Sequence, residues 1–135
     1  MELREDQAWL LRSRVNLMPV AGALSLENDR LSFTLDAEAG EASLGWLEEE
    51  LGIDGIADRL AAGETIVAFD HPLDDCVITW PITGGGAVML VRAPERKWVV
   101  SYDYPVAGRI KTPIGMISGR RKAREWKRVL ADSGT

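Results

Sequence analysis

The chain has 135 residues, a length that fits one domain around one hydrophobic core. Hydrophobic residues make up 46% of the sequence and charged residues 27%, which excludes an intrinsically disordered chain. The single cysteine, Cys76, and the single histidine, His71, exclude an intramolecular disulfide and are too few for a structural zinc site. We therefore expect one domain over residues 1–135, in a reducing compartment, without a cofactor.

The net charge of −5 hides a strong asymmetry along the chain. Residues 1–108 carry 8 basic and 19 acidic side chains, whereas residues 109–135 carry 8 basic and 2 acidic ones. The segment 36–75 alone holds 12 carboxylates against the single Arg59. The chain is therefore bipolar, and such a distribution can orient charged partners.

No stretch of the sequence has the pattern of a membrane span or a secretory signal. Its apolar runs fall short of the roughly 18 residues that a membrane-spanning helix needs. Residues 15–26 are interrupted by Asn16, Pro19 and Gly22, and acidic side chains precede them. A signal peptide has a basic start and an unbroken apolar core instead. We therefore expect a cytoplasmic protein.

The beginning of the chain predicts strands. Apolar and β-branched residues over 8–18 predict a first strand that ends at Pro19. Residues 23–26 and 31–35 alternate apolar with polar side chains, and turn-forming residues 27–30 separate them, which predicts a hairpin. Because a half-buried strand has a period of two, one set of side chains in its second strand should face the core, namely Leu31, Phe33 and Leu35.

The pattern becomes helical over about 41–63. A helix is predicted over 44–51, capped by Ser43 and ended by Gly52, because its leucines share one helical face. A second short helix is expected between Asp54 and Gly63. Together they form a helical insertion between strands.

Strand patterns return after this insertion. Four segments rich in β-branched and aromatic residues are predicted strands: 65–69, 77–80, 88–91 and 98–104. Pro81 indicates an edge strand or a strand end, because proline cannot donate to a sheet. Three glycines at 84–86 favour a hairpin turn, and 94–97 favours another. The total is about seven strands.

The chain ends in a predicted amphipathic helix. Residues 106–118 predict a loop because they are rich in glycine, and Ser118 is expected to cap the helix that follows. Its apolar stripe comprises Ala123, Trp126, Val129 and Leu130. The opposite sector comprises Arg120, Arg121, Arg124, Lys127 and Arg128. Basic residues in the first turn of a helix oppose its macrodipole, so their presence at 120–122 suggests a functional reason.

The order of these elements resembles the pleckstrin-homology-like superfold. The stretch 15–26 followed by Asp29-Arg30-Leu31-Ser32-Phe33 is similar to the opening of GRAM-type domains, in which a glycine precedes a strand, a turn and an Arg-Leu-x-Phe strand. Residues 70–75 before Val77 resemble the short strand and Pro-Leu step of the same group. The chain is thus similar to GRAM-type or bacterial PH-like domains.

This resemblance implies a mainly β, α+β fold: a bent antiparallel sheet or partly open barrel, capped by the C-terminal helix. Two features depart from the family. The helical insertion replaces a direct strand connection, and residues 18–22 lack the Lys or Arg of a phosphoinositide site.

Few residues could carry catalysis. Residues 70–76 offer a histidine, carboxylates and a thiol, but a nucleophile needs a base and an orienting group in a fixed geometry. A small, buried structural role for Cys76 explains the pattern better. Asp74 and Asp75 lack further metal ligands at a recognised spacing, and the glycines at 84–86 lack the helix that a phosphate loop requires. We therefore expect a protein that is not an enzyme.

The basic end of the chain is the candidate binding surface. Its residues are Arg109, Lys111, Arg120, Arg121, Arg124, Lys127 and Arg128. One explanation is that they balance the acidic segment 36–75, in this molecule or a neighbouring copy. The functional alternative is an interaction module for an acidic protein or peptide, or one that contacts anionic membrane peripherally. A nucleic-acid partner is disfavoured by the acidic pI of about 4.9. The oligomeric state stays open, with a homodimer among the options.

Overall fold

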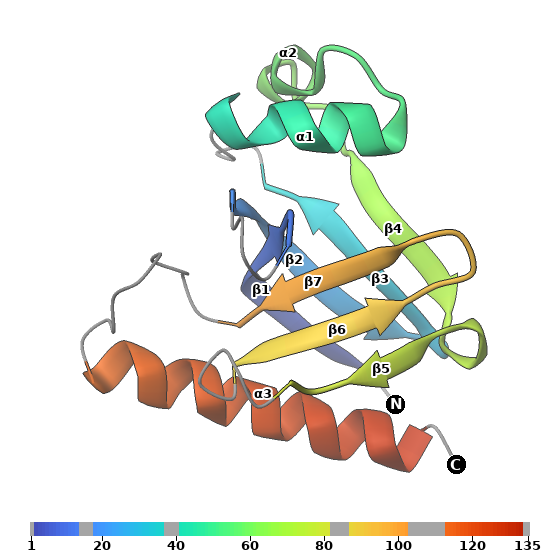
Figure 1. Ribbon diagram of the computed structural model, residues 1–135, viewed down its shortest axis with the longest axis vertical. Coiled ribbons are helices and arrows are strands. Elements are labelled where there is room, and N and C mark those ends of the chain that lie inside the picture. The colour runs from blue at the N-terminus through green and yellow to red at the C-terminus, as the bar shows by residue number, and fades with distance from the viewer. Residues whose placement is uncertain (1, 14–17, 37–40, 82–86, 103–112, 134–135) are drawn as a thin grey trace.

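The computed structural model describes residues 2–13, 18–36, 41–81, 87–102 and 113–133, with the backbone alone at 41–43, 113–119 and 132–133 (Figure 1). Its seven strands are β1 (Leu3–Leu11), β2 (Val20–Glu27), β3 (Arg30–Leu35), β4 (Val67–Pro72), β5 (Val77–Thr79), β6 (Val88–Arg92) and β7 (Lys97–Ser101). Its helices are α1 (Glu41–Leu51), α2 (Ile56–Ala61), the 3₁₀ helix η1 (Leu73–Asp75) and α3 (Pro113–Ser133). The predicted mainly β architecture, with helices after the third strand and at the end, is confirmed.

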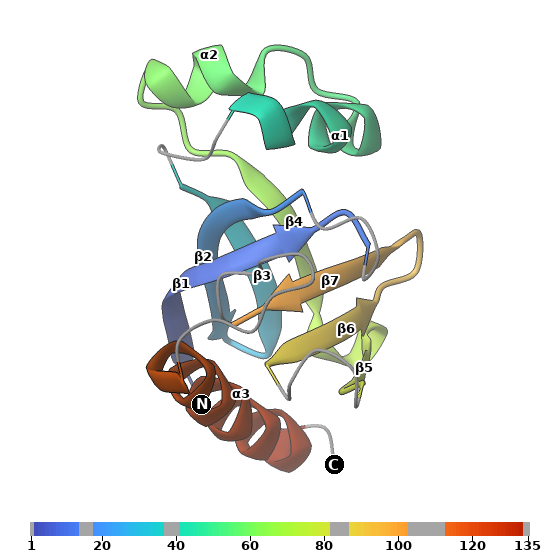
Figure 2. The same ribbon diagram turned by 60° about the vertical axis from the view of Figure 1, so that its left-hand side comes forward.

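All seven strands form one antiparallel sheet in the order β4-β3-β2-β1-β7-β6-β5. The two edge strands, β4 and β5, are separated along the chain only by residues 73–76. So short a connection requires the sheet to curl until its edges approach each other, as both views show (Figures 1 and 2). The result is the bent, partly open barrel that was predicted.

The predicted hairpin is present as β2 and β3. Asn28 and Asp29 connect the strands with φ values of 53° and 59°. Two successive residues with positive φ make a type I′ turn, whose twist matches that of the strands it joins. The predicted core residues are buried, with relative exposures of 6% or less: Leu31, Phe33 and Leu35.

The boundaries of the first strand were predicted wrongly. β1 lies over Leu3–Leu11, so it begins five residues before the predicted 8–18, and β2 begins at Val20. Residues 14–17 of the prediction lie outside the described residues. A register shift between Glu5 and Ala8 interrupts the alternation of β1 against β2. Because such a bulge displaces the side-chain period, the polar first half of the strand lacks a strand signature.

The bounds of two further strands differ from the predictions. β4 continues to Pro72, three residues beyond the expected 65–69, and its position at the sheet edge accommodates the proline. The strand predicted over 98–104 ends at Ser101, and the predicted glycine turn at 84–86 lies outside the described residues. As expected for a strand before Pro81, β5 is an edge strand.

The helical insertion lies between β3 and β4 at one end of the molecule (Figures 1 and 2). α1 begins at Glu41, so Ser43 belongs to the helix and is not the cap that we predicted. Gly52, with φ 67°, ends α1, and the N–H of Ile53 donates to the Glu48 carbonyl at 3.2 Å. This bond is the one that a Schellman C-cap forms, which explains why a glycine stands there.

Contacts with the sheet hold the insertion in place. Leu44, Trp46 and Leu47 of α1 are buried, and the Trp46 indole N–H donates to the Met18 carbonyl at 3.0 Å. Arg96, in the β6–β7 turn, donates to the backbone carbonyl of Glu50 and lies 3.8 Å from its carboxylate. These contacts join α1 to both halves of the sheet.

The start of the C-terminal helix was predicted wrongly. α3 begins at Pro113 instead of after a Ser118 cap, so part of the segment 106–118 is helical. Proline is favoured at the first helical position, where its missing N–H costs nothing. Arg120 and Arg121 consequently lie beyond the first turn, and the macrodipole argument for a functional role does not apply to them.

The packing of α3 matches the prediction. Its apolar stripe is buried, with Trp126 1% exposed, Ala123 2%, Leu130 6% and Val129 8%. Lys122 forms an ion pair with Glu5 of β1, with 3.2 Å between Nζ and Oε1. α3 closes the end of the barrel opposite α1 and α2 (Figures 1 and 2). None of the helices in the described ranges is both long and apolar enough to cross a membrane.

Candidate functional site

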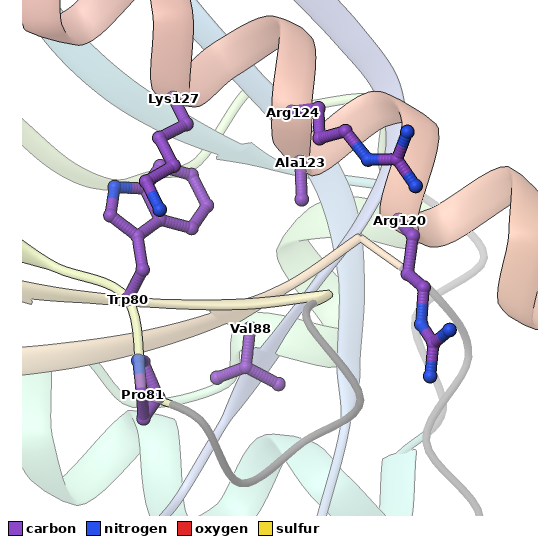
Figure 3. A pocket seen from close by; sticks show the side chains of 7 residues that line it. All are labelled: Trp80, Pro81, Val88, Arg120, Ala123, Arg124 and Lys127. Atoms are coloured by element: carbon purple, nitrogen blue, oxygen red, sulfur yellow. The ribbon is translucent and has the colours of Figure 1, made fainter.

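An open groove runs between the edge strand β5 and helix α3, and we call it the β5–α3 groove. Its first part, of about 370 Å³, is lined by Trp80, Pro81, Val88, Arg120, Ala123, Arg124 and Lys127 (Figure 3). Its second part, of about 400 Å³, is lined by Leu73, Asp74, Cys76, Ile78, Trp80, Lys127, Leu130 and Ala131. Trp80 and Lys127 line both parts, so the two parts adjoin each other.

β5 supplies one wall and an open backbone edge. The strand pairs with β6 on one side, and no strand in the described part of the chain pairs with its other side. Ile78 and Trp80 line the groove, whereas Val77 points away from it and is 59% exposed. Such an edge offers N–H and C=O groups to an additional strand.

A stack of aromatic rings leads from the groove into the core. The half-buried Trp80 stacks on Tyr102 with ring centroids 6.0 Å apart, and Tyr102 packs on Trp126 at the same distance. The Tyr102 hydroxyl donates to the Met89 sulfur at 3.5 Å, and burial raises the pKa of this phenol well above its ordinary value. The indole wall is therefore fixed by rings that belong to both the sheet and the helix.

Three cations of α3 border the groove. Lys127 extends toward the Trp80 ring, whereas Arg120 and Arg124 follow along the helix (Figure 3). Arg121 and Arg128 are also exposed, on the outer side of the helix. No described carboxylate lies within ion-pair distance of Arg121, Arg124, Lys127 or Arg128.

The structure thus brings together part of the predicted site. Arg120, Arg124 and Lys127 meet at the groove, and the two other cations, Arg121 and Arg128, lie beside it. Arg109 and Lys111 lie outside the described residues.

The described ion pairs do not support the explanation that this basic surface balances the acidic segment 36–75 within the molecule. α1 and α2 lie at the opposite end from α3 (Figures 1 and 2). The described ion pairs of that segment's carboxylates are with Arg30, Arg59 and Arg96, none of which belongs to α3. The charge on the outer side of α3 therefore faces solvent.

No protein-family model matches the chain, and no curated protein matches it. Among solved structures, it is similar to the crystal structure of the pleckstrin homology domain of ArhGAP27 over the whole length of both chains. The TM-score is 0.51 and the sequence identity is 10%, so the likeness concerns the fold. The chain has a pleckstrin-homology-like (PH-like) fold. Within it, the groove lies beside the C-terminal helix of the PH-like barrel.

The histidine and the thiol of residues 70–76 have separate contacts. His71 stacks on Phe69, and the Cys76 thiol donates to the Pro72 carbonyl at 3.6 Å. Burial raises the pKa of this thiol, and the charge of Asp75 raises it further. In the described ranges, no three or more His, Cys, Asp or Glu side chains gather as metal ligands.

Sequence reasoning missed the apolar wall of the groove. Trp80 and Pro81 were assigned only to the end of a strand, and Val88 only to the beginning of another. Their common surface depends on α3 lying beside β5, a contact across more than 40 residues of chain that no local pattern reveals. One signal was present, because Pro81 marks an edge strand, and edge strands are available for binding.

Proposed function

We propose that the chain is a non-enzymatic PH-like interaction module that binds an acidic protein or peptide segment in the β5–α3 groove. The observation that carries this proposal is the combination of an open strand edge, the half-buried indole of Trp80, and the cations Arg124 and Lys127, which have no described carboxylate within ion-pair distance. An extended segment could pair its backbone with β5 and direct alternate side chains into the groove.

The chemistry of the groove specifies the kind of segment. Trp80, Pro81 and Val88 provide apolar contact area for side chains that point inward. Lys127 and Arg124 would pair with carboxylates on the partner, and charges at the rim of an interface mainly set the association rate and its salt dependence. A partner with alternating apolar and acidic residues satisfies both requirements.

Several observations support a non-enzymatic role. Cys76 is the one thiol of the chain, and its raised pKa keeps it protonated at neutral pH. His71 packs on an aromatic ring, and the two parts of the groove are open and lined mainly by cations and apolar groups, with Asp74 and Cys76 in the second part. This arrangement suits recognition of a surface.

Peripheral contact with anionic membrane is the second candidate. Each Lys or Arg near an anionic leaflet contributes about 1 kcal/mol, and five of them are exposed on α3. However, the apolar stripe of α3 is buried against the sheet and cannot insert into lipid. The electrostatic term alone gives weak, salt-sensitive contact, so we favour the acidic segment.

We also propose that the chain is related to GRAM-type domains. The support is local: Gly22 on β2 lies against the Phe33 ring of the Arg-Leu-x-Phe strand, so the two motif positions depend on each other. An alignment of homologues that retains the glycine and the phenylalanine together would test this relationship.

The test of the proposed function is selection from a displayed library of random peptides. We expect the wild-type chain to enrich acidic sequences with alternating apolar residues, and to bind a selected peptide at least tenfold more tightly than the Arg124→Glu/Lys127→Glu variant does. The peptide should shift the amide NMR signals of β5 and α3.

The matched control is Arg92→Glu/Lys97→Glu, which changes the net charge equally on the exposed β6–β7 pair. It should bind like wild type. Peptides without acidic enrichment, or equal loss in both variants, would contradict the proposal. Vesicles containing phosphatidylserine form a second arm, and capture by vesicles without peptide binding would favour the membrane candidate.

A further inference from the structure

The outer side of α3 carries a second cationic surface next to the groove. Arg121, Arg124 and Arg128 follow at spacings of three and four residues, which places them on one stripe of the helix. All three are exposed, and no described carboxylate pairs with them. Arg124 borders the groove as well, whereas Arg121 and Arg128 do not line it. We call these three residues the outer basic face.

The opposite end of the molecule carries carboxylates that are equally unpaired. Glu49, Asp54 and Asp58, in α1, α2 and their connection, are exposed and have no described basic partner. Three other described acidic side chains of this region are engaged. Glu48 accepts from the Ile56 N–H at 2.9 Å, Glu50 lies near Arg96, and Glu64 pairs with Arg59 at 3.2 Å. Glu49, Asp54 and Asp58 are the acidic end.

The two surfaces cannot satisfy each other within one molecule. They lie at opposite ends of its longest axis, with the barrel between them (Figures 1 and 2). Both are helical surfaces held rigidly, one by the Trp126 stripe and the other by Trp46 and Arg96. A second copy is therefore the simplest partner that offers the complementary charge to each end.

We propose that copies of this chain associate head to tail, with the acidic end of one copy docked on the outer basic face of the next. Three unpaired cations meet three unpaired carboxylates in this arrangement. Because the two patches differ, the contact is heterologous, and it leaves a free acidic end and a free basic face after each addition. The assembly grows into short chains rather than stopping at a symmetric dimer.

The contact should be weak and strongly dependent on salt. Exposed ion pairs contribute little individually, and screening removes them when the Debye length falls below their separation. The groove residues Trp80 and Lys127 take no part, whereas Arg124 belongs to both surfaces. Self-association is therefore tested through Arg121 and Arg128, which do not line the groove, so that its failure and the failure of peptide binding can be told apart.

Sedimentation velocity of the full chain over a range of protein concentrations tests the proposal. At about 0.01 M salt, where the Debye length is about 30 Å, the average mass should rise with concentration past that of a dimer. At about 1 M salt, where the Debye length is about 3 Å, the chain should be monomeric. The Arg121→Glu/Arg128→Glu and Glu49→Lys/Asp58→Lys variants should each be monomeric at low salt.

Mixing the two variants gives the decisive outcome. Each retains one native surface, so an equimolar mixture should recover association that neither variant shows alone. Arg92→Glu/Lys97→Glu and Glu2→Lys/Glu95→Lys carry matched charge changes elsewhere on exposed residues and should associate like wild type. A monomeric wild-type chain at low salt, a dimer that grows no further, or no recovery on mixing would overturn the proposal. Circular dichroism confirms that each variant folds.

Discussion

Gly22 shows how closely packed the centre of the hairpin is. It lies on β2 opposite Leu35, and a Cβ atom added there would overlap both the Phe33 ring and the backbone carbonyl of Thr34. The ring could rotate, but the carbonyl belongs to the sheet and cannot move without disturbing the hydrogen-bonded ladder. The need for glycine at this position therefore comes from a neighbouring strand.

We expect Gly22→Ala to lower the free energy of unfolding by about 1–3 kcal/mol, the usual effect of overpacking a core. Gly45 is the control, because it lies exposed in α1 with no atom within 4 Å of an added Cβ. Gly45→Ala should raise stability by about 0.5–1 kcal/mol through helix propensity. Urea denaturation of both variants measures the difference, and a neutral Gly22→Ala would show that the strands can separate without strain.

The thiol of Cys76 is expected to react slowly. Its pKa is raised first by burial and then by the negative charge of Asp75, so less thiolate is present at a given pH than in an unfolded chain. Alkylation by iodoacetamide near pH 8.5 should be several-fold slower in the folded protein than in urea. Asp75→Asn should lower the pKa only in part, because burial is the larger cause, and Asp74→Asn should leave it unchanged. Equal rates in folded and unfolded protein would contradict this expectation.

At the scale of elements, α3 depends on its apolar stripe. Trp126 lies between the helix and the sheet, with its ring against Tyr102, and only 1% of it is exposed. Burial of an indole removes a large apolar area from water, so this side chain provides much of the docking energy of the helix.

Trp126→Ala should lower the free energy of unfolding by about 3–5 kcal/mol, and Trp126→Phe by less. Arg128→Ala, on the outer side of the same turn, should stay within about 0.5 kcal/mol of wild type. Denaturant titrations followed by circular dichroism compare the three variants. If Trp126→Ala were as stable as wild type, the helix could not be packed as described.

Elements with strong local patterns were predictable from sequence. The β2–β3 hairpin could be predicted because the alternation of its strands and the turn residues Asn28-Asp29 agree. The packing face of α3 could be predicted because its apolar residues are regularly spaced. The start of α3 could not be predicted, since glycines around Pro113 conceal a helix, and β1 was misplaced because the bulge after Glu5 breaks its alternation. Local rules fail where a neighbouring element determines the conformation.

At the scale of the whole molecule, the separation of charge is the main feature. The cations of α3 that border the groove were among the residues predicted from sequence, because basic side chains cluster between positions 120 and 128. The groove could not be predicted, because it is formed by β5 and α3 only after the sheet curls. The position of the acidic insertion, at the end of the molecule opposite α3, could not be predicted either, because it depends on the order of strands in the sheet.

This separation predicts unusual chromatography. Although the net charge is −5, the chain should be retained on a cation-exchange resin at pH 7 and about 0.01 M salt, because the basic face of α3 can turn toward the resin. Raising the salt to about 0.15 M should release it. Arg121→Glu/Arg128→Glu should pass through unretained, whereas Arg92→Glu/Lys97→Glu should be retained. If the wild-type chain flowed through, the basic face of α3 would be too diffuse to bind the resin.

The sheet order also constrains how the chain is made. β1 is the first strand to leave the ribosome, yet one of its two neighbours is β7, the last strand of the sheet. At about 5–20 residues per second, β1 waits roughly 4–17 s for that neighbour to be synthesised. Throughout this interval one flank of β1 is unsatisfied, and nascent copies on the same messenger could pair through it. The part of β1 that later pairs with β7 is Trp9–Leu11. The charged residues Arg4, Glu5 and Asp6, in the other half of the same strand, are of the kind that discourages strand pairing and leave only this short apolar part open to it.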